Sequence, residues 1–249
     1  MHRGFSLVEL SIVLVILGLL TGGILAGQSL IRASELRAVT TEYNRYTTAV
    51  QAFRDKYFAI PGDFSNATGI WGKSTNCSGT VATGTCDGNG NGILSATAAG
   101  ATSEIFQFWN QLALAGLIEG SYSGLTGAGG LWESLPGTNV PNSKLSGASW
   151  SVMYFANYVG DGGAYAFNYQ HFFSFGAYRA GNINNNPILK TEEAWNIDTK
   201  LDDGMPASGK IVAYNWTTCT TSTANNDYTG TYKLNATGAR CALWAAHSF

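Results

Sequence analysis

The chain has 249 residues, of which 45% are hydrophobic and only 12% are charged, and its formal net charge is −2. Its 12 Phe, 12 Tyr and 7 Trp exclude a disordered chain, and its 31 glycines are too few and too irregular for collagen. The balanced charge provides no basic surface for nucleic acid.

The N-terminal part of the chain is apolar from residue 5 to residue 29, with Glu9 as its single charge. About 20 apolar residues in a helix cross the hydrocarbon of a bilayer, so this segment is long enough to span a membrane. Basic residues lie on both sides, so they do not settle its orientation. A secretory signal peptide is the alternative, with residues 25–27 as a weak cleavage site, but the helical pattern continues through them.

Glu9 is costly in this setting, because a carboxylate within a membrane segment costs about 3 kcal/mol and needs a partner. It either reaches the headgroups or meets a cation. The residues 4–10, Gly-Phe-Ser-Leu-Val-Glu-Leu, followed by the apolar run, resemble the processing site of type IV pilins and type II secretion pseudopilins.

That resemblance implies a leader of residues 1–4, cleavage by a prepilin peptidase after Gly4, and N-methylation of Phe5. It implies further that Glu9 pairs with the freed amine of Phe5 on a neighbouring subunit of a filament. A pair of this kind neutralises two charges that are each unfavourable in hydrocarbon.

The helix is expected to continue beyond the membrane as an amphipathic segment, residues 30–58, and to end at the Ile-Pro-Gly of residues 60–62. At 1.5 Å per residue, a helix over residues 5–58 is roughly 80 Å long. Its apolar stripe recurs in steps of three and four, and five charged residues fall outside it. The stripe consists of Leu36, Val39, Tyr43, Tyr46, Val50, Phe53 and Tyr57, and the charged residues are Arg37, Glu42, Arg45, Arg54 and Asp55.

Residues 59–249 are predicted to form one globular extracytoplasmic domain of the α+β class with an antiparallel sheet. Residues 103–117 and 191–203 read as helices, capped by Ser103 and Thr191. The strand candidates are 149–158, 163–178 (with alternation over 164–169), 210–218, 232–234 and 241–246.

All four cysteines follow the apolar segment, as expected in an oxidising compartment. Three disulfide pairings are possible. We favour Cys77 with Cys86 and Cys219 with Cys241, because both loops are short. A zinc site is the weaker alternative, since no two cysteines have close ligand spacing.

Residues 87–93, Asp-Gly-Asn-Gly-Asn-Gly-Ile, match the first half of an EF-hand-type calcium loop. Asp87, Asn89 and Asn91 would provide side-chain oxygens, Ile93 its carbonyl, and Glu104 the missing carboxylate. Position 12 is Ala98 rather than Glu, which predicts weak binding, and a plain Asn/Gly turn is the alternative. The calcium reading gains weight from the resemblance, because pseudopilin-like proteins often pair such a loop with a nearby helix.

Two further stretches, 57–64 and 197–210, resemble a subgroup of bacterial prepilin-like proteins. Asp202 and Asp203 are candidates for a cation site, although charges at a helix end are usually solvated. Because no phosphate loop, nucleophile elbow or paired catalytic carboxylates occur, we expect a protein that is not an enzyme.

The resemblance implies a subunit of a type IV pilus or pseudopilus-like filament. Its partners would be further copies of the chain, the peptidase, the membrane and an inner-membrane assembly platform. The protein would first lie in the inner membrane and then in an extracellular or periplasmic filament. The alternative is a membrane-anchored extracytoplasmic binding or hydrolytic domain that does not polymerise.

Overall fold

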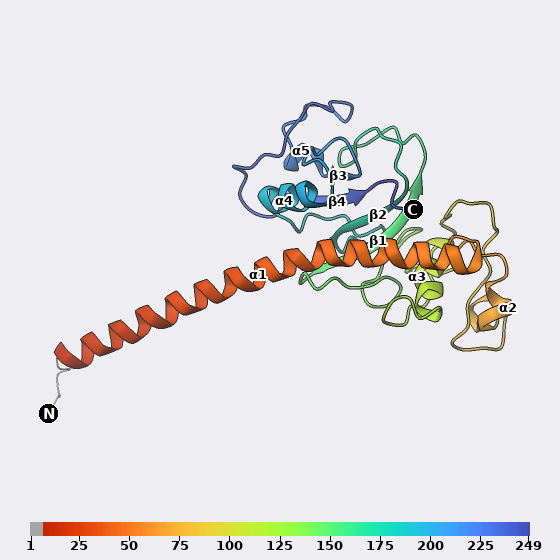
Figure 1. The fold of residues 1–249 in the computed structure, drawn as a ribbon, viewed down its shortest axis with the longest axis horizontal. Helices are drawn as coiled ribbons and strands as arrows, with labels where there is room; N and C mark the ends of the chain where they lie inside the picture. The colour runs from red at the N-terminus through yellow and green to blue at the C-terminus, as the bar shows by residue number, and fades with distance from the viewer. Residues whose placement is uncertain (1–6) are drawn as a thin grey trace.

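A single long helix carries the globular domain on its C-terminal half (Figure 1). The computed structural model describes residues 7–249, and α1 runs without a break from Leu7 to Tyr57. The long helix predicted from the sequence is therefore confirmed.

The end of α1 depends on two residues with left-handed backbone conformations. Phe58, which has φ +53°, donates its N–H to the carbonyl of Arg54 at 2.8 Å and closes the last turn. Gly62 has φ +87°, and a Cβ at this position would collide with the carbonyl of Glu104. Only glycine therefore allows the chain to turn back past the start of the next long helix.

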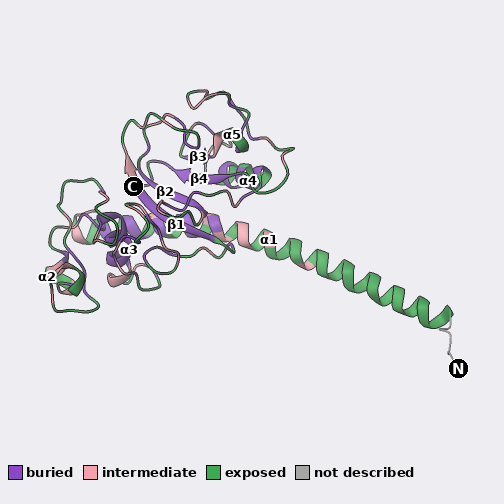
Figure 2. Ribbon diagram, turned by 180° about the vertical axis from the view of Figure 1, so that it is seen from behind, coloured by how far each residue is buried: buried purple, intermediate pink, exposed green. Residues whose placement is uncertain are grey.

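The two halves of α1 differ sharply in burial (Figure 2). Residues 7–31 are exposed almost throughout, whereas the second half packs on the domain along the predicted stripe. The buried positions are Val39, Glu42, Tyr43, Tyr46, Ala49, Val50 and Phe53, with Leu36 and Tyr57 partly buried. The prediction that Glu42 lies outside this stripe was wrong.

The sheet has four antiparallel strands in the order β1-β2-β4-β3. β1 (Ala148–Phe155) pairs along its whole length with β2 (Gln170–Ala177), with Trp150 opposite Phe175. β4 (Ala242–Ala245) lies between β2 and β3 (Ile211–Tyr214). A helical and a strand-rich part in one domain confirm the α+β class.

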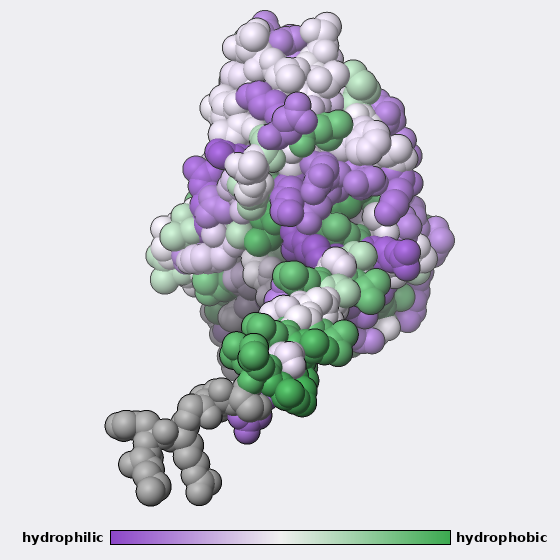
Figure 3. Space-filling model, turned by 90° about the vertical axis from the view of Figure 1, so that its left-hand side faces the viewer, coloured by the Kyte–Doolittle hydropathy of each residue, from purple (hydrophilic) through white to green (hydrophobic). Residues whose placement is uncertain are grey.

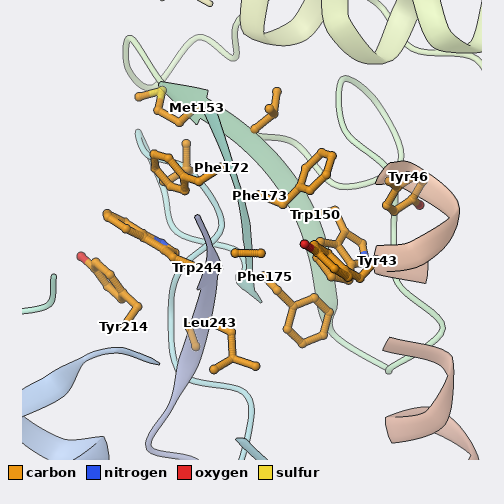
Figure 4. Packing of buried hydrophobic residues seen from close by; sticks show 14 of the residues in the cluster. Tyr43, Tyr46, Trp150, Met153, Phe172, Phe173, Phe175, Tyr214, Leu243 and Trp244 are labelled. Atoms are coloured by element: carbon orange, nitrogen blue, oxygen red, sulfur yellow. The ribbon is translucent and has the colours of Figure 1, made fainter. Parts of the chain in front are cut away.

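Both faces of the sheet are covered by aromatic side chains (Figure 4). On the α1 face, Phe173 packs against Tyr46 and Trp109, with ring centroids 6.2 and 5.8 Å apart. On the other face, Trp244 packs against Phe172 at 4.6 Å and Tyr214 at 4.7 Å. Because a strand presents alternate residues to opposite faces, near-continuous burial of β1 and β2 means that the sheet is a central layer.

The shorter elements differ in part from the sequence prediction. The two helices are confirmed as α3 (Glu104–Leu114) and α4 (Thr191–Leu201), but the N-cap of α4 is Lys190, so the assignment of Thr191 was wrong. Three short helices were not predicted: α2 (Ala67–Trp71), the 3₁₀ turn η1 (Thr75–Cys77) and α5 (Trp216–Cys219).

Two strand predictions also fail, because these segments form only isolated bridges and join no sheet. Residues 164–169 are irregular: Tyr165 and Tyr169 are fully buried, and β2 begins only at Gln170. Residues 232–234 contribute one isolated bridge, between Tyr232 and Thr220.

The disulfides are the two pairs that short loops favoured. Cys77 bonds to Cys86 with Cα atoms 5.9 Å apart, and Cys219 bonds to Cys241 with Cα atoms 5.1 Å apart. The second bond links the end of α5 to the residue before β4.

Glu42 fixes the position of α1 on the domain. It is 5% exposed, and its carboxylate accepts hydrogen bonds from Ser143 Oγ (2.7 Å), Lys144 N (2.8 Å) and Trp150 Nε1 (2.8 Å). A buried carboxylate is tolerated only where donors surround it in this way. The three donors come from β1 and the turn before it, so they define one rotation and one axial position of the helix.

We predict that Glu42→Ala lowers the free energy of unfolding by about 2–4 kcal/mol, because it leaves these donors without an acceptor. Glu42→Gln, which keeps one acceptor oxygen, should cost less. Chemical denaturation of the detergent-solubilised chain, followed by tryptophan fluorescence, measures both.

Glu119→Ala is the matched control, because the Glu119 side chain is 94% exposed. It should change the free energy of unfolding by less than about 0.5 kcal/mol. Equal losses for Glu42→Ala and Glu119→Ala would contradict the proposed role of Glu42.

Candidate functional site

The N-terminal half of α1 exposes a continuous apolar surface. Its side chains point outward on all sides of the helix, with Leu7 86%, Leu19 74% and Leu30 72% exposed. Seen from the helix end, this apolar segment projects from a domain whose visible surface is mostly hydrophilic (Figure 3). By length and composition it could cross a membrane, and none of its most apolar 18-residue window is buried. It is therefore not the buried core helix of a soluble domain.

The few hydroxyl groups in this segment are satisfied within the helix itself. Ser11 donates to the carbonyl of Val8 at 2.9 Å, Thr21 to that of Leu17 at 2.8 Å, and Ser29 to that of Ala26 at 2.8 Å. Such bonds remove the need for water at these positions. The segment is consequently compatible with hydrocarbon or with a tightly packed helical bundle.

Four glycines of α1 have no packing role within the chain. A Cβ at Gly18, Gly22, Gly23 or Gly27 would meet nothing within 4 Å. Each glycine nevertheless weakens a helix by roughly 0.5–1 kcal/mol relative to alanine. Contacts within the single chain therefore do not explain these glycines.

The residues of the expected processing site fall at the edge of the structure. Gly4 and Phe5 lie outside the described residues 7–249, so their predicted roles are not addressed by the structure. Glu9 lies in the first turn of α1, where the positive end of the helix dipole favours a carboxylate.

A two-pronged ion pair holds α1 where it leaves the domain. Arg32 donates from Nε and Nη2 to the two carboxylate oxygens of Glu193 at 2.7 and 2.6 Å. Burial alone would raise the pKa of Glu193, but hydrogen bonds from Arg32 and from Lys190 N lower it. Since Glu193 also accepts the backbone N–H of Lys190, the N-cap of α4, the pair connects the start of that helix to α1.

The Asn/Gly loop of residues 87–93 is organised by carboxylates. Asp63, 4% exposed, accepts the N–H groups of Gly90 (2.7 Å), Asn91 (3.1 Å) and Gly92 (2.7 Å). Glu104 accepts the N–H of Asn89 at 3.0 Å. The loop therefore turns its amides inward around two acids. Asp63 was missed by the sequence analysis, although it directly follows the Pro-Gly that ends α1.

The residues expected to bind calcium all make hydrogen bonds of their own. Asp87 accepts from Thr68 N and Oγ1 at 2.8 Å each, and Asn89 and Asn91 each accept from the backbone two residues later. Glu104 also accepts from Ser95 N (2.9 Å) and Ser95 Oγ. The bonds of Asn89 and Asn91 are those of two consecutive Asx turns. Calcium binding through Asp87, Asn89, Asn91, the Ile93 carbonyl and Glu104 stays a prediction.

A second acidic group lies at the end of α4. Carboxylate oxygens of Asp198, Asp202 and Asp203 lie within 4.8 Å of one another, which is close enough to hold a cation. Asp198 is fully buried and accepts from Tyr232 Oη at 2.8 Å and Gly204 N at 3.1 Å. Burial raises its pKa to about 7, with smaller contributions from the two neighbouring acids.

This pKa predicts a pH-dependent stability. In the folded chain Asp198 holds its proton to about pH 7, well above the ordinary 3.8. The contribution of the protonated Asp198 to the free energy of unfolding is therefore fully present below about pH 4 and is lost as the pH rises through 7. In EDTA, the free energy of unfolding should fall by about 2–4 kcal/mol more between about pH 5 and pH 8 in the unmodified chain than in Asp198→Asn.

Asp227→Asn is the control for this measurement, because hydrogen bonds from Thr223 and Thr229 lower the pKa of the half-buried Asp227 below its ordinary value, and therefore below this pH window. Its slope should equal that of the unmodified chain. An Asp198→Asn variant with an unchanged slope would refute the assignment.

Comparison with known proteins bears on the N-terminal segment. Residues 1–25 match the prokaryotic N-terminal methylation motif, which includes Gly4, Phe5 and Glu9. The curated proteins and the solved structures gave no match to the chain. The motif implies processing by a prepilin peptidase, and together with the apolar helix it indicates membrane anchoring before assembly. Together, the motif and the uncovered apolar helix that follows it support the assignment of this chain to the type IV pilin-like prepilins.

Proposed function

We propose that the chain is a structural subunit of a type IV pilus or pseudopilus-like filament. The observation that carries this proposal is the apolar surface of residues 7–31, which the chain's own domain leaves uncovered. Such a surface is stable in only two settings, a bilayer before assembly and a bundle of like helices after it. A filament whose core is made of these helices covers it without a further protein.

Processing would prepare the helix for this core. Cleavage after Gly4 removes the basic residues His2 and Arg3 and creates an amine on Phe5. We propose that this methylated amine pairs with Glu9 of a neighbouring subunit in the filament. Because the pair joins two chains, it sets the axial offset between neighbouring helices.

The glycines of the segment support close helix packing. Gly18, Gly22, Gly23 and Gly27 let neighbouring backbones approach, as small residues do between membrane helices. The globular domains would then lie on the outside of the filament. The part of α1 that connects each domain to the filament core is oriented by the Arg32–Glu193 ion pair. The assembly platform and an extracellular or periplasmic destination are part of this proposal.

The alternative is a membrane-anchored domain that binds or hydrolyses a ligand without polymerising. It uses the same anchor but requires no contact between helices. The two proposals therefore differ in what Glu9 and the N-terminus do.

Mass spectrometry of the N-terminus tests processing. In cells with a prepilin peptidase, we expect the first tryptic peptide to begin at N-methylated Phe5 and sheared surface material to contain filaments. Gly4→Val should leave residues 1–4 in place, because the cleaved bond would lose its glycine. Intact Met1 in the unmodified chain, together with no filaments, would overturn the proposal.

Glu9→Gln tests assembly. We expect it to abolish filaments or to reduce their number at least about tenfold, because the buried amine of Phe5 would lose its counter-charge. Membrane insertion should persist, since the apolar run is unchanged. Electron microscopy and membrane fractionation measure the two effects.

Glu192→Gln is the matched control, since Glu192 is an exposed acid in the first turn of α4. Normal filaments with both variants would contradict the proposed pairing of Glu9, whereas an unmodified chain that forms no filaments would favour the non-polymerising alternative.

A further inference from the structure

A cavity of about 140 Å³ lies on the sheet face that is turned away from α1. Figure 4 shows Trp244 and Tyr214 on this face, across the sheet from Tyr43 and Tyr46. Its lining comes from β1, β3 and β4, from the loop after β2, from residues 158–161 and from Trp132. The lining includes Trp132, Phe155, Tyr158, Asp161, Arg179, Asn185, Tyr214 and Trp244. We call this site the aromatic cavity.

The aromatic rings of the cavity are held in stacked pairs. Tyr214 stacks on Trp244 with centroids 4.7 Å apart and 27° between the planes, and Phe155 stacks on Tyr158 at 4.7 Å and 11°. Trp132 on the wall is half-buried. Rings fixed by packing offer flat apolar faces at little entropic cost to a ligand.

Hydrogen-bond donors in the cavity lack acceptors. Asn185 is 2% exposed, and its Oδ1 accepts from Arg179 Nη1 at 3.2 Å, so its Nδ2 is the donor end. Within residues 7–249, this Nδ2 donates to no acceptor. Arg179 Nη1 also donates to Tyr214 Oη at 3.0 Å, which leaves the phenol proton without an acceptor in the described structure. Donors that line a cavity and have no protein acceptor can be satisfied by the oxygen of a ligand or of water.

An acid also lines the aromatic cavity. Asp161 Oδ2 accepts from Tyr158 Oη at 2.8 Å, and its Oδ1 accepts the N–H groups of Gly163 and Ala164 at 2.7 Å each. These bonds fix the carboxylate at the rim. The cavity therefore contains one positive and one negative side chain and has no net charge.

This pattern of charge discriminates among ligand classes. A cation would meet Arg179, and an anion would meet Asp161, so neither is matched on both sides. A hydroxyl group both accepts and donates, and it can satisfy Asn185 and Arg179 as well as Asp161. A compact ring with several hydroxyls and apolar C–H faces fits both the donors and the stacked aromatic side chains.

We propose that the aromatic cavity binds one ring of a neutral carbohydrate. Its volume is below the 300–1,000 Å³ of sites for larger ligands, so a single ring is the unit it accepts. A ligand with so few atoms binds a single site weakly, with a Kd in the millimolar range. A filament would repeat the site along its length and raise the avidity for a glycan surface; that step rests on the proposed function, whereas binding to one chain does not.

The test uses the full chain in a detergent without a sugar headgroup. The methyl glycosides of glucose, galactose, mannose and N-acetylglucosamine are titrated while tryptophan fluorescence and saturation-transfer NMR are recorded. We expect a saturable signal with at least one of the four. No saturable signal from any of them, up to their solubility, would overturn the proposal.

Matched variants locate the binding. Arg179→Gln and Trp132→Ala should each weaken it at least about tenfold, equal to about 1.4 kcal/mol. Arg240→Gln and Trp195→Ala should leave it unchanged, because Arg240 is an exposed arginine and Trp195 lies on α4, outside the cavity. Circular dichroism checks that all four variants fold.

Two further results would contradict the proposal: equal weakening by the controls, or tighter binding of glucosamine or glucuronate than of the neutral glycosides. The outcome is separable from that of the filament proposal. A chain that binds sugar but forms no filaments retains the aromatic cavity and loses only the filament function.

Discussion

One continuous helix has to be stable in two different surroundings, and the rest of the structure follows from this constraint. Up to residue 31, α1 is apolar on all sides and nothing in the described chain covers it. From Val39 onward it carries a narrow buried stripe that packs on the sheet. The change falls between these two positions, where Arg32 is held by Glu193 of α4. The ion pair thus lies where the exposed apolar half of α1 meets the half that packs on the domain.

The domain is built around the second half of this helix. Phe173, at the centre of β2, contacts rings from α1, α3, β1 and the C-terminal residue, including Tyr46, Trp109 and Phe249. Apolar packing of this kind holds the elements together but does not fix their register, because aromatic surfaces can slide. The three hydrogen bonds to Glu42 supply the register. A force transmitted along α1 would therefore act on the sheet through a directional contact as well as an apolar one.

Several of the few acidic residues of the domain order its loops. Asp63, Glu104, Glu133 and Asp161 each accept backbone N–H groups of glycine-rich or irregular segments. A carboxylate that collects several amides orders a segment that has few apolar side chains of its own. With so few acids available, most of those in the domain that the structure describes hold loops in place. The Asn/Gly loop of residues 87–93 is an example, because its backbone amides surround Asp63. Its sequence pattern is typical of calcium loops, but the same pattern allows backbone amides to surround an acid.

The sequence by itself determined the features that depend on local pattern. The apolar run, the processing motif, the stripe over residues 36–57 and the end of α1 near Pro61 follow from helical periodicity and backbone restrictions. Both disulfides agreed with the short-loop argument. Tertiary structure alone decided the roles of residues whose partners are distant in sequence. Glu42 is buried because donors about 100 residues away surround it, and Tyr165 and Tyr169 are fully buried outside any strand although their alternation predicts one. Arg179, Asn185 and Tyr214 meet only because β2 and β3 flank β4. Periodicity reports which side of an element is apolar, whereas the contacts of a polar group depend on the order in which strands pair, and no local pattern encodes that order.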